Sequence, residues 1–287
     1  MKTLENGLFT GERALFCTED ARIKNSVFED GESPLKESHS LELLGCIFRW
    51  KYPLWYCKDV TVRDSVLEIT ARSGIWYTEN IEMHSCKIDA PKTFRRSKGI
   101  TLIDCDMENA LESMWYCKDV SVKNAHVVGD YFGLSCENFC GENIVLDGNY
   151  FLDGAKNAVI KSSVLNSKDA FWNCENVEVY DSVIIGEYIG WNSRNVRFVN
   201  CKIESNQGFC YMDGVELVNC VLENTVLAFE YSSVNAAVNS KIDSVKNPRC
   251  GKITANEIGE LIMEEKFVDT SRTEIIIKKQ HGVGYEL

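Results

Sequence analysis

The sequence predicts an all-β protein, a single-stranded parallel β-helix of about twelve coils. Two observations lead to this prediction: a motif recurs about every twenty residues, and apolar residues within each copy alternate with a period of two. The chain has 287 residues, which is long enough to bury a large core. A unit of about twenty residues cannot bury its own apolar face, so it must stack on its neighbours.

The repeat is clearest in three segments that read as one unit, residues 54–65, 75–86 and 114–125. An alignment on the small polar residue or glycine that ends a strand gives the anchors Asn25, Gly45, Asp64, Ser85, Asp104, Asn124, Gly148, Ser162, Asp181, Asn200, Asn219 and Asn239. Successive anchors lie 19 to 21 residues apart, except for intervals of 24 and 14 on either side of Gly148. We therefore predict an uneven coil around residues 134–157.

Two columns of this alignment are apolar in every copy. The column two positions before the anchor includes Val62, Met83 and Leu102, and the column three positions after it includes Leu67 and Ile88. With 45% hydrophobic residues overall, two such columns are not expected by chance. They predict side chains that point into a shared dry interior.

Polar residues and glycine mark the corners of each unit. A second corner is expected at Asp20, Asp59, Asn80, Gly99, Asp119, Asn143, Asn176, Asn195 and Gly214. Asp, Asn and Gly tolerate the left-handed backbone that a tight corner needs. Each unit is therefore predicted to contain three short strands, two compact turns and one variable loop.

Three segments are predicted along the chain. Residues 14–254 form the β-helix, residues 1–13 form an N-terminal cap, and residues 255–287 form a C-terminal cap, because an open β-helix exposes unpaired strand edges at its ends. Within the last segment, residues 256–265 are expected to form a short amphipathic helix and residues 273–278 a strand.

Units of the type Val-x-Val-x-Asn-Cys-x-Ile, as in residues 196–203 and 215–222, resemble the coils of pectin-lyase-like β-helices. The whole chain is similar to an uncharacterised bacterial family of that fold. The resemblance covers residues 14 to about 254 and implies a right-handed helix, but no activity. Secreted polysaccharide-cleaving enzymes of this fold use clustered aspartates, and the sequence contains no adjacent Asp-Asp pair.

Charge and hydropathy exclude two classes of partner. The net charge of -12, from 31 Lys and Arg against 43 Asp and Glu, argues against a nucleic-acid partner. No window approaches the ~18 consecutive apolar residues of a membrane span, so no membrane partner is expected. Glu5, Glu12 and Arg13 interrupt the apolar stretch that an export signal needs, which predicts a cytoplasmic protein.

The thirteen cysteines are predicted to be reduced thiols. Eight of them share inward corner columns with serine and threonine, namely Cys46, Cys57, Cys86, Cys105, Cys117, Cys174, Cys201 and Cys220. Cys136 and Cys140 form a C-x-x-x-C pair, but two further metal ligands cannot be placed. No metal ion and no other cofactor is predicted.

An aromatic column supplies the candidate ligand-binding residues. Nine positions before the anchor stand five of the six tryptophans, and the same column holds Arg95 with Arg96 beside it; the candidate contacts are Trp55, Trp76, Arg95, Arg96, Trp115, Trp172 and Trp191. Alternation along a strand turns this column outward. Exposed rings can stack on sugars or anchor a protein, and two guanidinium groups suit an acidic sugar. The alternatives are that loops bury the rings, and that the arginines are ordinary surface charges.

Three functional hypotheses follow, and the sequence does not decide whether the protein is an enzyme. The first is a cytoplasmic protein that binds or processes an oligosaccharide with the aromatic and arginine face. The second is a non-catalytic scaffold that docks a partner protein or forms a homo-oligomer. The third is a solenoid that binds something unrelated to sugars. Acidic residues of the uneven coil could supply a catalytic pair, but no spacing singles out two among Asp130, Glu137, Glu142, Asp147 and Asp153.

Overall fold

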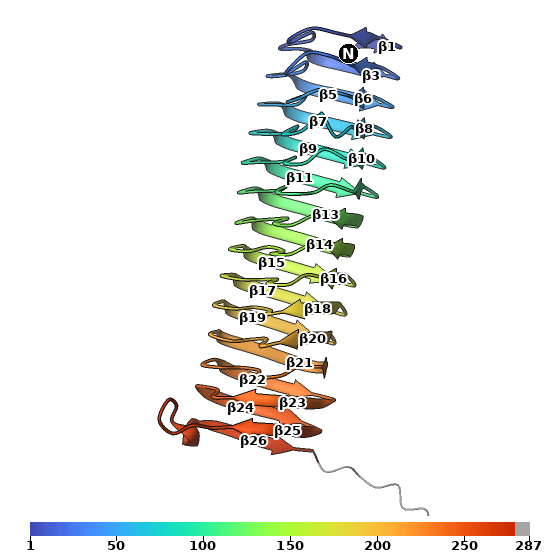
Figure 1. Ribbon diagram of the computed structural model, residues 1–287. Helices are drawn as coiled ribbons and strands as arrows, with labels where there is room; N and C mark the ends of the chain where they lie inside the picture. The colour runs from blue at the N-terminus through green and yellow to red at the C-terminus, as the bar shows by residue number, and fades with distance from the viewer. Residues whose placement is uncertain (279–287) are drawn as a thin grey trace, which may run out of the picture.

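The computed structural model describes residues 1–278 and is a parallel β-solenoid of about 15 turns (Figure 1). The chain winds coil by coil from the blue N-terminal end to the red C-terminal end, where one loop extends out from the stack. The predicted fold class is confirmed, and the array is longer than the twelve coils that the sequence suggested. The difference arises at the two ends, where segments expected to be caps add coils of their own.

Each coil contributes a longer strand to one side of the solenoid. These strands are β1 (Lys2–Glu5), β3 (Glu19–Lys24), β5 (His39–Leu44), β7 (Lys58–Arg63), β9 (Glu79–His84), β11 (Lys98–Ile103), β13 (Lys118–Val128), β14 (Glu137–Asp147), β15 (Lys156–Lys161), β17 (Glu175–Tyr180), β19 (Arg194–Val199), β21 (Asp213–Glu223), β22 (Ser233–Val238), β24 (Cys250–Ala255) and β26 (Thr273–Ile277). Every pairing between these strands is parallel, as a stacked coil requires.

A second side is built from shorter strands that follow a sharp corner. They are β2 (Leu8–Phe9), β4 (Val27–Phe28), β6 (Ile47–Phe48), β8 (Val66–Leu67), β10 (Lys87–Ile88), β12 (Asp106–Met107), β16 (Val164–Asn166), β18 (Val183–Glu187), β20 (Lys202–Asn206), β23 (Lys241–Lys246) and β25 (Glu257–Ile262). In β13, β14 and β21 the two sides form one continuous strand. A third side consists mainly of turns. The 3-10 turn η1 (Thr270–Arg272) is the only helical element of the described residues, and it is far too short to cross a membrane.

Like side chains stack along the interior in the predicted register. Val62 pairs with Met83 and Met83 with Leu102 on successive strands, and all three side chains are fully buried. The second apolar column is also buried, for example at Leu67 and Ile88. At about 25 cal/mol per Å² of buried apolar surface, these two columns supply much of the driving force for folding.

Left-handed corners hold the coils together. Every residue that the sequence placed at the second corner has positive φ, from 48° at Asp20 to 81° at Gly214. Side-chain amides link these corners from coil to coil: the Nδ2 of Asn157 donates to the Oδ1 of Asn138 at 3.2 Å, and the Nδ2 of Asn176 donates to that of Asn157 at 3.0 Å. The ladder compensates for a backbone conformation that costs about 1 kcal/mol or more in most residues.

The uneven coil predicted around residues 134–157 is wrong. Ala125 pairs with Ile144, and the Nδ2 of Asn143 donates to the Oδ1 of Asn124 at 3.0 Å, so Asn143 and not Gly148 is the anchor of this coil. Anchors then fall at Asn124, Asn143 and Ser162, exactly one regular coil apart each time. Any small polar residue or glycine fits the anchor position, so the sequence pattern alone could not distinguish Asn143 from Gly148.

The corrected register changes the position assigned to Phe139 and accounts for the presence of Gly141. Phe139, which stands nine positions before Gly148 and was therefore expected in the tryptophan column, pairs with Val120 and is buried in the core. Gly141 occupies the first apolar column between Val122 and Ile160. A Cβ at this glycine would lie 2.7 Å from the Cδ1 of Ile144 and 2.9 Å from that of Ile160, so larger neighbours fill its space.

Both ends continue the stack. Residues 1–13 contain β1 and β2, which pair in parallel with β3 and β4. Lys2 lies in register with buried Ala21 but is itself exposed, and a charge at an inward position discourages further strand pairing.

The C-terminal segment contains two more paired strands. The helix expected at residues 256–265 is a wrong prediction, because β25 pairs in parallel with β23 and this long-range pairing outweighs local helix propensity. The strand expected at residues 273–278 is confirmed as β26, which pairs with β24. Residues 279–287 of the expected cap lie outside the described residues.

Candidate ligand-binding surface

The tryptophan column lies on the third side of the solenoid, in turns and not on a strand. The backbones of Trp76, Arg95 and Trp115 pair through isolated parallel β-bridges outside the strands. The residue before each tryptophan, such as Leu54 or Ile75, is fully buried, as the sequence predicted. The tryptophans themselves are half-buried, which is intermediate between the two alternatives that the sequence left open.

Ring faces in the first half of the column are covered by one another. The Trp55 and Trp76 rings stack with centroids 5.1 Å apart and planes 9° from parallel. The Arg95 guanidinium then lies between two indoles, 4.7 Å from the Trp76 centroid and 4.4 Å from the Trp115 centroid. A sugar needs a free ring face for stacking, and these faces are occupied.

Two tyrosines connect Trp115 to Trp172, the next tryptophan of the column along the chain. Tyr131 and Tyr150 stack at 4.4 Å, and they contact Trp115 and Trp172 edge to face at 6.4 and 5.9 Å. Trp172 then contacts Trp191 with centroids 6.1 Å apart. Aromatic contacts therefore run along the axis through most of the array.

Four indole N–H groups of the column also form hydrogen bonds. Each donates its N–H to a backbone carbonyl of the next coil: Trp55 to Ser73 at 2.5 Å, Trp76 to Lys92, Trp115 to Tyr131 and Trp172 to Tyr188, each at 2.8 Å. Half-buried rings with satisfied donors hold the turns of neighbouring coils together. The tryptophan column is thus mainly a structural ladder.

Arg95 and Arg96, adjacent in sequence, are separated by the structure. Arg95 lies inside the ladder, with one Nη 3.7 Å from a Glu112 carboxylate oxygen, and its Nε has no hydrogen-bond partner in residues 1–278. Arg96 has a φ of 51° and is exposed, with its guanidinium 5.3 Å from the Tyr116 ring centroid. Only Arg96 can reach a ligand in solution.

Next to the half-buried tryptophans, one position further along the chain, stand tyrosines that are more exposed. We call Tyr56, Tyr77, Tyr116 and Tyr211 the tyrosine column; they are 39–48% exposed. Tyr56 and Tyr77 stack at 4.8 Å with planes 6° apart, and Arg96 occupies the next coil. Each of these residues has positive φ, and this turn geometry, which strand alternation does not anticipate, directs the tyrosines outward.

A cationic hollow lies beside the tyrosine column. Its volume is about 330 Å³, and it is lined by Arg96, Ser97, Lys98, Tyr116, Lys118, Ser135 and Glu137. Lys118 forms an ion pair with Glu137 at 2.7 Å, and Lys98 lies 3.7 Å from Asp119. Arg96 has no ion-pair partner within residues 1–278, so its charge is free for an anion.

Sequence reasoning missed Asp169, which lies near the junction of Tyr150 and Trp172. Its side chain is 2% exposed, and its Oδ1 has no hydrogen-bond partner within the described residues. Burial raises the pKa of this carboxyl group and outweighs the hydrogen bond with Tyr150 and the charge of Lys168, which lower it; the charges of Glu187 and Asp153 add smaller increases. No local pattern could reveal it, because its burial depends on how successive loops pack.

The acidic residues of residues 130–153 do not form the pair considered from the sequence. Each has a separate partner: Asp130 accepts from the Asn149 backbone, Glu137 pairs with Lys118, Glu142 with Lys123, Asp147 accepts from Asn166, and Asp153 from Asn173. Cys136, which directly precedes β14, is buried, whereas Cys140 within β14 is exposed, so the two thiols point in different directions and do not form a shared metal site.

The chain belongs to a family described as "Protein of unknown function (DUF3737)", which matches residues 2–276. No curated protein matches the chain.

Solved structures show low similarity. PfbA, a surface adhesin of Streptococcus pneumoniae, gives a TM-score of 0.41 at 9% identity, covering 91% of this chain and 84% of that one. The A-module of the Azotobacter vinelandii mannuronan C-5 epimerase AlgE4 gives 0.33 at 10% identity, covering 97% and 89%. Full-length QnrB1, a plasmid-mediated fluoroquinolone resistance protein, gives 0.36 at 15% identity, covering 68% and 93%. These values carry no argument about function.

Proposed function

We propose that this protein binds an acidic oligosaccharide in the cationic hollow and along the neighbouring tyrosine column. One observation carries the proposal: Arg96, without an ion-pair partner in residues 1–278, lies against an exposed tyrosine in a hollow that Lys98 and Lys118 also line. A guanidinium group recognises a carboxylate through two parallel hydrogen bonds. An exposed tyrosine beside it offers a ring and a hydroxyl to the sugar.

The proposal narrows the contacts expected from the sequence. Arg96 and Tyr116 would contact the ligand. The other predicted contacts would hold the binding surface in place without touching the ligand; they are Trp55, Trp76, Arg95, Trp115, Trp172 and Trp191. We further propose that the β-helix is of the pectin-lyase-like type and that the protein is cytoplasmic. The proposed activity is binding without catalysis, because a reaction would need positioned acid and base groups in the hollow, and its one carboxylate, Glu137, is paired with Lys118.

Titration with oligouronides by calorimetry tests the proposal, with neutral oligosaccharides of equal length for comparison. We expect the uronides to bind and the neutral sugars to bind at least tenfold more weakly. Arg96→Gln should lower the uronide affinity by about 10- to 100-fold, because a hydrogen bond to a charged group contributes roughly 1.5–3 kcal/mol.

Arg63→Gln is the matched control. Arg63 is also exposed and lines a second cationic hollow, with Arg22 and Lys24, that contains no aromatic residue. We expect this variant to bind as the wild type does. Equal losses in both variants would mean non-specific attraction to positive charge, and no uronide binding at all would refute the proposal.

A second function, a scaffold for a protein partner or for a homo-oligomer, is favoured by one observation. Rings of the aromatic ladder cover one another, so the tyrosine column offers mostly ring edges and hydroxyl groups, and tyrosine is enriched at protein interfaces. Light scattering tests the homo-oligomer. A dimer that Tyr56→Glu and Tyr77→Glu convert to monomer would support it, and a monomer in the wild type would exclude it.

A further inference from the structure

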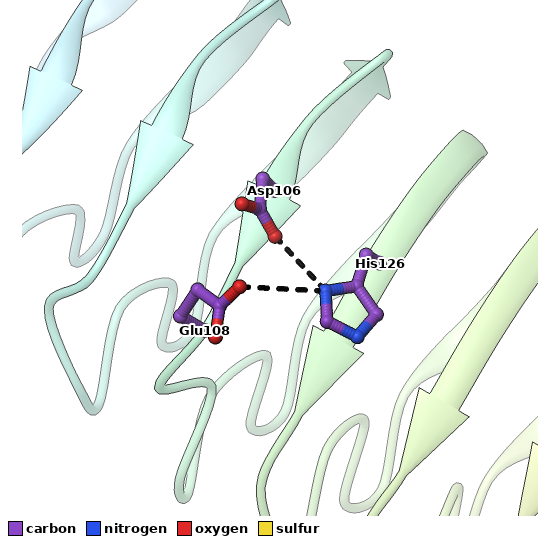
Figure 2. Close-up of side chains that lie close together, drawn as sticks. All are labelled: Asp106, Glu108 and His126. Atoms are coloured by element: carbon purple, nitrogen blue, oxygen red, sulfur yellow. Dashed lines mark hydrogen bonds and ion pairs between the residues drawn. The ribbon is translucent and has the colours of Figure 1, made fainter.

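A second cluster of polar residues lies on the second side of the solenoid, away from the tyrosine column. Asp106 in β12 and His126 in β13 are register partners on neighbouring strands, and Glu108 follows Asp106 by two residues. Figure 2 shows the three side chains converging from adjacent coils. The Nδ1 of His126 lies 3.1 Å from the Oδ1 of Asp106 and 3.8 Å from the Oε1 of Glu108.

The parallel register and the turn after β12 create this cluster. Register partners on neighbouring strands lie side by side, and Glu108 lies in the turn that directly follows β12, two residues after Asp106. One ligand atom from each of Asp106, Glu108 and His126 lies within 4.8 Å of the others. Two of the three residues stand on paired strands, so their positions are fixed by backbone hydrogen bonds and not by a loop.

These distances match the coordination sphere of a transition metal. Zinc binds nitrogen at about 2.0–2.1 Å and carboxylate oxygen at about 2.0–2.2 Å, so its tetrahedral ligands lie roughly 3.3–3.5 Å apart. The two measured separations from Nδ1 bracket that value. Small side-chain rotations would therefore place a metal ion between the three donors, with the imidazole proton on Nε2.

The local charge also favours a divalent cation. With a neutral imidazole the cluster carries two negative charges, and His126 is the only ion-pair partner of Asp106 and Glu108 in the described residues. Lys87, the register partner of Asp106, pairs with Asp89 at 3.2 Å; this contact is the main cause of its raised pKa, and the charges of Glu108 and Asp106 add smaller increases.

An adjoining hollow leaves the cluster open on one side. Glu108 lines this hollow, about 390 Å³ in volume, together with Asp130 and Asp147. Water or a ligand could reach the remaining coordination positions from there.

We propose that Asp106, Glu108 and His126 bind a divalent transition-metal ion of the zinc class, with the remaining coordination positions open to solvent. The side chains are 43–53% exposed, so the affinity is expected to be micromolar and not that of a closed structural site. The sequence, considered alone, predicted no metal ion. A spacing of two residues plus one coil, Asp-x-Glu followed by His twenty residues after the Asp, is the signal that could have found it.

Zinc titration of the full chain by calorimetry tests this site. Thiolates are zinc ligands, and Cys17, Cys140 and Cys250 are exposed or half-buried, so the experiment uses a background in which all three are serine. We expect one micromolar site in this background, and zinc should shift the NMR signals of the His126 ring. His126→Gln should weaken binding at least tenfold, and Asp106→Asn should do the same.

His39→Gln is the matched control. His39 is also 45% exposed and its Nε2 lies 2.9 Å from Glu19, but it has one carboxylate neighbour where His126 has two. This variant should bind zinc as the background does. Circular dichroism verifies that each variant is folded. The proposal is overturned if the background binds no zinc, or if His126→Gln and Asp106→Asn, both folded, bind it with unchanged affinity.

Discussion

Burial controls the chemistry of the cysteine residues. The eight thiols that the sequence placed in inward columns are all buried, and their Sγ atoms contact backbone carbonyls; that of Cys174 donates to the Leu152 oxygen at 2.9 Å. Burial raises the pKa of Cys57 and of Cys174 to about 12. Since the thiolate is the reactive form, these residues are protected against alkylation and oxidation.

Thiol labelling of the folded protein should therefore be selective. We expect rapid reaction at Cys17 and Cys140, slower reaction at half-buried Cys250, and none at the buried thiols near pH 8. Mass spectrometry after brief alkylation identifies which cysteines have reacted. All thirteen cysteines should react in denaturant. Rapid labelling of Cys57 or Cys174 in the folded state would contradict the inward columns.

Asp169 gives a prediction about pH. Its pKa is raised in the folded state, so the folded protein binds the proton more tightly than the unfolded chain does. The stability that the protonated carboxyl contributes is fully present below the unfolded pKa, near 3.9, and is lost as pH rises through the folded value.

Asp169→Asn should therefore be more stable than wild type at pH 7 and should lose less stability between pH 4 and pH 7. Urea unfolding at several pH values measures both. A variant that is less stable than wild type at pH 7 would show that the ionised carboxylate is satisfied in the fold.

At the scale of the element, the ladder of Trp76, Arg95 and Trp115 joins three successive coils. A desolvated cation between two rings contributes about 2 kcal/mol or more, against about 0.5–1 kcal/mol at an exposed site. Arg95→Ala should thus lower the free energy of unfolding by roughly 1–3 kcal/mol. Arg96→Ala, which removes an exposed guanidinium from one ring, should cost less than about 1 kcal/mol.

Chemical denaturation of both variants tests this difference. Arg95→Trp is an informative third variant, because the same column holds tryptophan in five other coils, among them the two coils next to Arg95. It should retain most of the stability that Arg95→Ala loses. Equal stabilities for Arg95→Ala and Arg96→Ala would show that the sandwich contributes little.

The ladder also shows where sequence reasoning stops. The column itself was predictable, because Trp55, Trp76 and Trp115 stand at one position of a repeated unit. Their partial burial was not, because it depends on turns whose positive φ turns the neighbouring tyrosines outward. Which residue is exposed follows from backbone geometry, and the sequence contains only the residue types.

At the scale of the whole molecule, the stack was predictable and its exact coil boundaries were not. Val62, Met83 and Leu102 recur after 21 and 19 residues, close to the length of one coil, so their shared interior follows from periodicity. Asn143 was passed over for Gly148 because both fit a corner, and only pairing between strands distinguishes them. Contacts across coils, such as those of Asp169 and of His126, depend on that pairing.

The central claim is that the protein is a stack of interchangeable coils, each in register with the next. Deleting residues 156–174 removes one complete coil and joins Ala155 to Glu175, the register partner of Lys156. In a solenoid each coil contacts mainly its neighbours, so β14 should pair with β17 and the rod should shorten by about 4.8 Å.

Circular dichroism and small-angle scattering of this deletion, beside a deletion of residues 156–165, test the claim most directly. We predict that the full-coil deletion keeps its β-structure and a cooperative unfolding transition, and that the partial deletion loses both. A full-coil deletion that unfolds as completely as the partial one would contradict the stacked-coil structure.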